Sequence, residues 1–149
     1  MLFRSGRNAL YRFGPGGGTA TAPLATLDVP LFDMAFDSQG NLWATTGGGP
    51  LVQLDPDTGA IVGRYGDGVT LGMAATPGGT TLYIAGSGGV RIFDLTTRAF
   101  RPFSDVRVNG LAIDGDGRLW GTTWPDGGQI VRFDSRGRAE VMADVGKPA

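Results

Sequence analysis

Histidine and cysteine are both absent from the 149 residues of this chain. Without histidine, the chain lacks the commonest metal ligand, the usual general base near neutral pH and the usual partner of a nucleophilic serine or cysteine. Without cysteine, it has neither disulfides nor thiolate metal sites. The sequence therefore excludes every class of enzyme whose chemistry depends on an imidazole of this chain.

Charge of one sign and long apolar runs are also missing. The 13 basic and 14 acidic residues give a net charge of -1 and are interspersed, so no basic face for nucleic acid is expected. No stretch approaches the roughly 18 apolar residues of a membrane helix. Residues 1–5 lack the apolar core of a signal peptide. We expect no nucleic-acid partner, no membrane segment and no signal peptide in this segment.

What the chain does contain is a repeat. A leucine followed by an aromatic residue recurs, and the four leucines are 40, 40 and 37 residues apart. The 27 glycines and 9 prolines fall at turn positions between short apolar strands. A period of about 40 residues with four strands per repeat is typical of β-propeller blades. The pairs are Leu2-Phe3, Leu42-Trp43, Leu82-Tyr83 and Leu119-Trp120.

The repeat predicts an all-β propeller segment of about four blades, each a four-stranded antiparallel sheet. In the first strand of each full repeat the three central residues are apolar, which suits an inner strand covered on both faces. The first blade lacks this inner strand. We expect one partial propeller domain with blades at 1–27, 28–66, 67–104 and 105–143 and a linker at 144–149.

An open arc of blades would leave an apolar face uncovered at each end, and large exposed apolar patches are unusual on soluble monomers. Three arrangements would cover these faces. The missing blades are elsewhere in the native chain, two copies complete a ring by self-association, or the four repeats close on themselves.

Most aspartates recur at the same turn of each repeat. A turn aspartate accepts hydrogen bonds from nearby backbone amides, so their recurrence indicates scaffold and not chemistry. These residues are Asp37 and Asp114 between the first and second strands, Asp55, Asp94 and Asp134 between the third and fourth, and Asp28, Asp67, Asp105 and Asp144 before the first.

Four polar or aromatic residues depart from the repeat and are our candidate ligand-binding residues. Asp33 replaces a glycine and Asn109 replaces a bulky apolar residue at the start of the first strand, so both would lie at one mouth of the central channel. Trp124 and Asp126 give one loop on the same face substantial side chains. The structural alternatives are a turn cap for Asn109, an arginine partner or solvent for Asp33, and a blade-edge cover for Trp124.

The repeats at residues 34–59 (MAFDSQGNLWATTGGGPLVQLDPDTG) and 111–134 (LAIDGDGRLWGTTWPDGGQIVRFD) resemble those of NHL-like and gluconolactonase-like (senescence marker protein) propellers. They are also similar to periplasmic propeller repeats of two-component sensors. The first resemblance implies that Asn109, in an Asn-Gly-Leu segment, could be one ligand of a divalent metal, calcium or zinc. It also implies a glutamate and an aspartate ligand. However, the single glutamate, Glu140, is on an outer strand, and the matching aspartate positions hold Phe32 or Leu71.

From these residues we expect a non-catalytic propeller module without a cofactor that binds a protein or small molecule on the channel-mouth face. The sensor resemblance implies a periplasmic or extracellular location. One alternative is a metal-dependent lactonase-like hydrolase whose site is completed by residues outside this segment. A second alternative is a structural ring used for oligomerisation.

Overall fold

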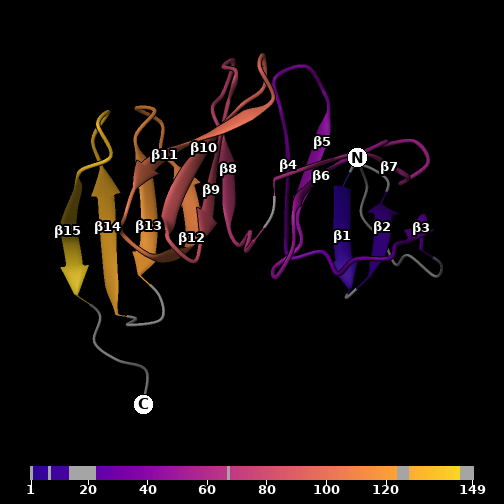
Figure 1. Ribbon diagram of the computed structural model, residues 1–149, viewed down its shortest axis with the longest axis horizontal. Helices are drawn as coiled ribbons and strands as arrows, with labels where there is room; N and C mark the ends of the chain where they lie inside the picture. Colours follow the sequence, from indigo (N-terminus) through magenta and orange to yellow (C-terminus); the bar gives the residue numbers. More distant parts are fainter. Residues whose placement is uncertain (1, 7, 14–22, 67, 124–127, 145–149) are drawn as a thin grey trace.

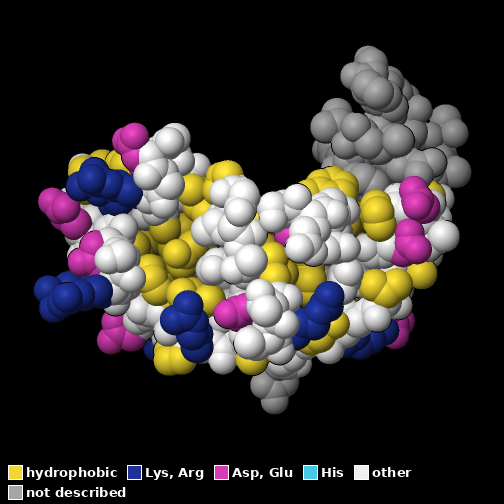
Figure 2. Space-filling view, turned by 90° about the horizontal axis from the view of Figure 1, so that it is seen from above, with side chains coloured by type: hydrophobic (Ala, Val, Ile, Leu, Met, Phe, Trp, Pro, Cys, Tyr) yellow, Lys and Arg dark blue, Asp and Glu magenta, His cyan; other side chains and the backbone are white. Residues whose placement is uncertain are grey.

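The computed structural model describes residues 2–6, 8–13, 23–66, 68–123 and 128–144. The described residues form 15 strands and no helix. Their four sheets follow one another along the chain, with the first and last at opposite ends of the molecule (Figure 1). Seen along the strands, the molecule is hollowed on one side, and hydrophobic side chains gather in the hollow (Figure 2). The sheets thus form an open arc in this structure.

All four sheets are antiparallel meanders, in which consecutive strands are neighbours. Sheet I has three strands: β1 (Leu2–Gly6), β2 (Ala9–Phe13) and β3 (Ala25–Thr26). Sheet II contains β4 (Asp33–Phe36), β5 (Leu42–Thr45), β6 (Leu51–Leu54) and β7 (Ile61–Tyr65). Sheet III contains β8 (Met73–Ala75), β9 (Thr81–Gly86), β10 (Gly89–Asp94) and β11 (Ala99–Ser104). Sheet IV contains β12 (Val108–Ile113), β13 (Leu119–Thr123), β14 (Gln129–Phe133) and β15 (Ala139–Asp144). The predicted fold class, a partial all-β propeller, is confirmed.

The hydrophobic core is divided among the three interfaces between successive sheets. Leu10 of sheet I packs with Leu42 and Val52 of sheet II. Trp43 of sheet II packs with Ile84 and Phe93 of sheet III, and Val90 of sheet III packs with Val131 and Phe133 of sheet IV. Each sheet therefore buries its apolar side chains mainly against its neighbours along the arc, as propeller blades do.

The first strands of the sheets lie next to one another, and the fourth strands lie outside. Strand β8 contacts β4 on one side and β12 on the other. In contrast, all six residues of β15 are exposed. The inner and outer strands predicted from the sequence are therefore inner and outer in the structure.

The aspartates of the turns within the sheets accept backbone hydrogen bonds, as the sequence predicts: Asp37, Asp55, Asp94, Asp114 and Asp134. Asp28, before a first strand, instead pairs with Arg64 at 2.8 Å, and Asp67 lies outside the described residues. Asp37 Oδ1 accepts from the amides of Gln39 and Asn41, both at 2.9 Å, and its Oδ2 accepts from Trp43 Nε1, also at 2.9 Å. Asp114 repeats this pattern, with Trp120 Nε1 donating at 2.7 Å. The aspartate therefore also fixes the tryptophan that follows it six residues later, a bond that the sequence analysis did not predict.

Candidate functional site

The inner strands β4, β8 and β12 begin at the same edge of the sheets, and we call this edge the mouth. It is formed by Phe32, Asp33, Asn109, the start of β8 at Gly72 and Met73, and the loop at residues 47–50. The inner strands bring Asp33 and Asn109 to this end, from opposite sides of β8.

Asp33 joins sheets II and III. Its Oδ1 accepts a hydrogen bond of 2.8 Å from the amide of Met34, and its Oδ2 accepts one of 3.0 Å from the amide of Met73 in β8. Met73 is 4% exposed, so the carboxylate satisfies a buried donor. The arginine partner suggested for Asp33 is not found in the described part of the chain. Its partners are backbone amides, one of them 40 residues away in sequence, and side-chain composition gives no signal for such a contact.

Asn109 lies at an irregularity of β12. Val108 pairs with Thr123 and Gly110 with Thr122, so Asn109 is the extra residue of a β-bulge. Its carbonyl accepts a 2.8 Å hydrogen bond from the amide of Gly72. Its half-buried side-chain amide makes no hydrogen bond with any residue that the structure describes, so the predicted turn cap is not formed.

Gly72 permits the close approach of β8 and β12. A Cβ at this position would collide with the carbonyl oxygen of Asn109 and would lie 2.9 Å from the Cα of Gly110. Gly72 and Met73 are adjacent, and they bond to Asn109 and Asp33 respectively. The two candidate residues are therefore held in place through one short segment of β8.

The loop at residues 47–50 is fixed by buried threonines that the sequence analysis missed. Thr70 Oγ1 donates to the carbonyl of Gly49 at 2.8 Å and accepts from the amide of Thr46 at 3.0 Å. Thr46 Oγ1 donates to the carbonyl of Pro50 at 2.7 Å. Thr46 and Thr70 are buried, so hydrogen bonds inside the protein hold the loop at 47–50 in place. The available signal was the pair of threonines at the end of the second strand.

Phe32 is a further mouth residue that sequence reasoning missed. Its side chain is 48% exposed, although it immediately precedes the inner strand. Its amide donates to the carbonyl of Thr45 at 2.8 Å, which places its backbone firmly beside β5. This exposed ring lies at the same end of the inner strands as Asn109, and such a combination suits a ligand with both apolar and polar parts.

Trp124 and Asp126, the other two predicted ligand-binding residues, lie in the segment 124–127, outside the described residues. Their role stays a prediction.

The described residues do not fit a divalent metal at the mouth. Over the ranges that the structure describes, no three acidic residues are grouped as metal ligands would be. Asn109 could supply one neutral oxygen, whereas Asp33 already accepts two backbone bonds. Calcium takes six to eight oxygen ligands. Glu140 is far along the chain in the outer strand β15. The weak metal assignment to Asn109 thus has no supporting ligand among these residues.

No helix in the described part of the chain is long and apolar enough to cross a membrane. The mouth is a polar and aromatic surface with fixed backbone, and it offers hydrogen bonds and apolar contact to a ligand.

Comparison with solved structures finds the same fold in several proteins. A gluconolactonase from Xanthomonas campestris superimposes with a TM-score of 0.72 at 20% identity, covering 96% of this chain and 57% of its own. The calcium-binding protein regucalcin from Agrobacterium tumefaciens gives 0.73 at 19% identity, with coverages of 93% and 54%. The extracellular domain of a one-component system from B. thetaiotaomicron gives 0.69 at 18% identity, with coverages of 95% and 23%.

These identities show a shared fold, and the chain spans little more than half the length of the first two structures. A search of curated proteins finds no match. One family model, described as the SMP-30/Gluconolactonase/LRE-like region, matches residues 25–148. This match covers most of the sequence, in agreement with the repeats and the arc of sheets. The chain belongs to the SMP-30/gluconolactonase/LRE-like family.

Proposed function

We propose that this chain is a non-catalytic recognition module that binds a small molecule or a protein segment at the mouth. The observation that carries the proposal is the hydrogen bonding of the Asp33 carboxylate. This carboxylate holds the amides of Met34 and Met73, so it serves as a bond between sheets II and III. It is thus engaged in the scaffold, and the described residues hold no group of three acidic side chains that could bind a metal.

The mouth has the features of a binding surface. Phe32 offers an exposed ring, and Asn109 offers a donor and an acceptor that no described residue uses. The loop at 47–50 is held by Thr70, so little conformational entropy is lost when a ligand binds beside it. A neutral ligand with an apolar face and hydrogen-bonding groups fits this combination. In this proposal Trp124 and Asp126 extend the same surface.

We also propose that the module works in the periplasm or outside the cell as part of a single propeller domain. The support is the likeness in fold to extracellular domains of sensor proteins from B. thetaiotaomicron. The blades would follow the ranges 1–27, 28–66, 67–104 and 105–143.

The second candidate function is a metal-dependent lactonase-like hydrolase. The family match and the unbonded side-chain amide of Asn109 at a β-bulge favour it. In this reading, residues other than the described ones would supply the acidic ligands. The gluconolactonase and the calcium-binding regucalcin are relatives in fold.

Calorimetric titration of the full chain with calcium and with zinc separates the two candidates, together with an assay of lactone hydrolysis using glucono-lactone. A recognition module gives neither metal-dependent hydrolysis nor any change in metal affinity in Asn109→Ala. Metal-dependent hydrolysis that Asn109→Ala abolishes would establish the hydrolase instead.

Ligand binding itself is measured by screening neutral sugars and lactones by NMR. We expect shifts at the amides of Asn109, Phe32 and the loop at 47–50. The variant Phe32→Ser should weaken binding without lowering the melting temperature, because Phe32 is exposed. Glu140→Gln, on the outer strand β15, is the matched control. Shifts confined to other parts of the arc would contradict a site at the mouth.

A further inference from the structure

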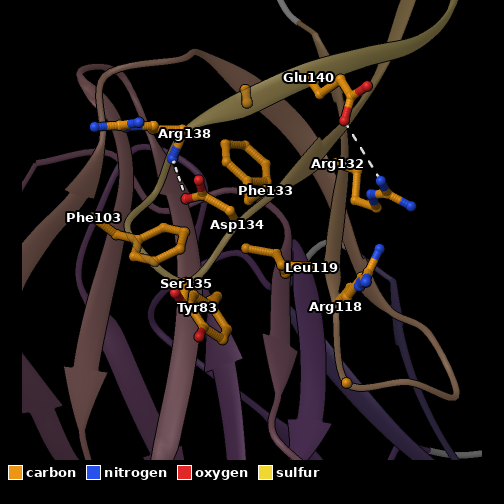
Figure 3. A pocket seen from close by; sticks show the side chains of 12 residues that line it. Tyr83, Phe103, Arg118, Leu119, Arg132, Phe133, Asp134, Ser135, Arg138 and Glu140 are labelled. Carbon is orange, nitrogen blue, oxygen red and sulfur yellow. Dashed lines mark hydrogen bonds and ion pairs between the residues drawn. The ribbon is translucent and has the colours of Figure 1, made fainter.

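A groove of about 560 Å³ opens between sheets III and IV, near the outer strands and the turn from β14 to β15 (Figure 3). Its walls include aromatic rings from both sheets and three arginines, one of which is Arg132. The lining residues also include Tyr83, Phe103, Leu119, Phe133, Arg118 and Arg138. None of them belongs to the mouth, so the groove is a separate feature.

The preceding interface, between sheets II and III, shows what ordinarily fills such a groove. There Phe100, the second residue of β11, packs its ring on Phe93 with centroids 4.9 Å apart. Leu95 packs in the same cluster. Arg98 crosses to sheet II and bonds to Tyr65 Oη at 2.6 Å. Three large side chains in or beside the turn from β10 to β11 thus close this interface.

The corresponding turn of sheet IV carries small residues at all three places. Phe93 pairs with Phe100 in sheet III, and Phe133 pairs with Ala139 in sheet IV, so Ala139 stands where Phe100 would be. Ser135 follows Asp134 as Leu95 follows Asp94. Gly137 lies two residues before Ala139, as Arg98 lies two residues before Phe100. Gly137 and Arg98 both have a positive φ, of 81° and 57° respectively. The groove therefore lies where the preceding interface has the ring of Phe100, whereas Gly137 itself packs closely against the carbonyl of Phe103.

The aromatic rings that line the groove are arranged like those that surround Phe100 in the preceding interface. Tyr83 and Phe103 meet edge to face at 5.1 Å, and Phe103 lies 5.9 Å from Phe133. Trp43, Tyr65 and Phe93 have the equivalent arrangement in the preceding interface, at 5.3 to 5.6 Å. In that interface the fourth ring is Phe100. Aromatic pairs at such distances are favourable beyond the area that they bury.

Three arginines line the groove, and two of them, Arg118 and Arg138, interact with Asp114 and Asp134 through space but form no close ion pair in the described part of the chain. Arg132 pairs with Glu140 at 3.5 Å, and Asp134 accepts from the amides of Arg138 and Arg136. These amide donors, the Arg138 amide first, hold the pKa of Asp134 below its ordinary value, so this carboxylate stays ionised. Within the described ranges, the side chains of Arg118 and Arg138 make no ion pair.

Arg118 lies on one side of the aromatic rings and Arg138 on the other (Figure 3). The hydroxyl of Tyr83 also has no hydrogen-bond partner among the residues described. An anion at the rim of the groove would gain a charge-assisted hydrogen bond from a guanidinium that forms no close ion pair with a carboxylate of the described chain.

We propose that this groove binds a small monocyclic aromatic carboxylate. Its ring takes the place that Phe100 has in the preceding interface and packs against Phe133 and Phe103. Its carboxylate reaches Arg118 or Arg138 at the rim. This inference goes beyond the recognition proposed for the mouth and does not depend on it.

The test is a calorimetric titration of the full chain with benzoate and 4-hydroxybenzoate. Cyclohexanecarboxylate tests the need for an aromatic ring, and benzyl alcohol tests the need for charge. We expect binding of both aromatic acids and an affinity at least about tenfold lower for the two comparison compounds. Failure of both aromatic acids to bind at about 10 mM would overturn the proposal.

The decisive variant is Ala139→Phe, which restores the ring of the preceding interface. It should fill the groove, keep or raise the melting temperature, and abolish binding of benzoate. One of the two variants Arg118→Gln and Arg138→Gln, the one that removes the guanidinium bound to the carboxylate, should weaken binding of benzoate but not of benzyl alcohol; unchanged benzoate binding in both would contradict the proposal. Arg101→Gln, on exposed β11, is the matched control. Unchanged benzoate binding in a folded Ala139→Phe variant would place the ligand elsewhere and refute the assignment.

The variants of the two sites keep the two proposals apart. Asn109→Ala and Phe32→Ser should leave benzoate binding unchanged, and Ala139→Phe should leave binding at the mouth unchanged. Loss of benzoate binding in the mouth variants would show that the aromatic acid binds at the mouth. This result would refute the groove proposal and leave the proposal for the mouth standing.

Discussion

Arg98, in the turn between β10 and β11, donates a hydrogen bond of 2.6 Å to the hydroxyl of Tyr65 in the preceding sheet. The same guanidinium donates to Gln53 Oε1 at 2.8 Å and lies 5.5 Å from the ring centroid of Trp43. Arg98 makes these contacts from a backbone with a φ of 57°, where a side chain is normally unfavourable. The strained turn is therefore held by its contacts with sheet II.

Replacing Arg98 by alanine removes these contacts but keeps most of the backbone strain. We expect a loss of about 1–2 kcal/mol in the free energy of unfolding. Arg98→Gly should lose less, because glycine adopts a positive φ without strain. Urea denaturation measures both variants, and Arg101→Ala is the control, expected within about 0.5 kcal/mol of the parent.

A double-mutant cycle with Tyr65→Phe isolates the bond itself. We expect a coupling of about 0.5–1 kcal/mol between Arg98 and Tyr65. A glycine variant less stable than the alanine variant would contradict the strained backbone.

Asp33 should contribute to stability beyond its place at the mouth. Asp33→Ala leaves the buried amide of Met73 without an acceptor, which should cost about 1–3 kcal/mol. Asp33→Asn retains one acceptor oxygen and should cost less. Chemical denaturation measures the loss, with exposed Asp57→Ala as the control. Equal stability of the Asp33 and Asp57 alanine variants would show that the hydrogen bond from Met73 to Asp33 does not stabilise the fold.

Gly117 and Gly137 allow backbone strain to be separated from close packing. Both have a φ of 81°, and each amide bonds to the carbonyl of an aspartate three residues earlier. A Cβ on Gly117 meets nothing within 4 Å, whereas one on Gly137 would collide with the carbonyl oxygen of Phe103.

Gly117→Ala should therefore cost about 1 kcal/mol, from the backbone alone. Gly137→Ala should cost about 1–3 kcal/mol more, because sheets III and IV must move apart locally. Thermal or urea unfolding compares the two variants directly. Equal losses would mean that the turn does not pack closely on Phe103.

Asp37 should make the fold sensitive to acid. Burial raises the pKa of this carboxyl, but hydrogen bonds from the Trp43 indole and from Asn41 and Gln39 outweigh burial and bring it below its ordinary value of 3.8. A lowered folded pKa means that the stabilisation is complete above the unfolded pKa and is lost as the pH falls through the folded one.

The variant Asp37→Asn cannot titrate, so its free energy of unfolding should fall less steeply below about pH 4 than that of the parent. Urea unfolding at neutral pH and at about pH 3 gives the two slopes. Parallel pH profiles for the two proteins would show that Asp37 makes no such contribution.

The fold could be predicted because its signals are local and repeated. The Leu-aromatic pairs mark β5, β9 and β13, and the apolar triplets mark the inner strands. Turn aspartates such as Asp37 and Asp114 bond within a few residues of themselves, so their role follows from the sequence.

The sites depend on contacts between sheets, which a single sequence does not display. The partner of Asp33 is a backbone amide in another sheet, and the bulge at Asn109 is set by pairing with β13. The groove results from three small residues in one turn, and their effect becomes visible only when two interfaces are compared. The mouth could thus be located from the sequence, whereas what its residues bond to could not.

The hydrogen bonds of β8 have a consequence for communication across the arc. Gly72 is bound to Asn109 of β12, and the adjacent Met73 is bound to the carboxylate of Asp33 in β4. Any shift of the Asn109 backbone must strain the first bond, and the neighbouring peptide carries that strain to the second. Two adjacent residues of β8 thus connect the inner strands of sheets II, III and IV. A displacement of β12 in sheet IV would in this way act on β4 in sheet II.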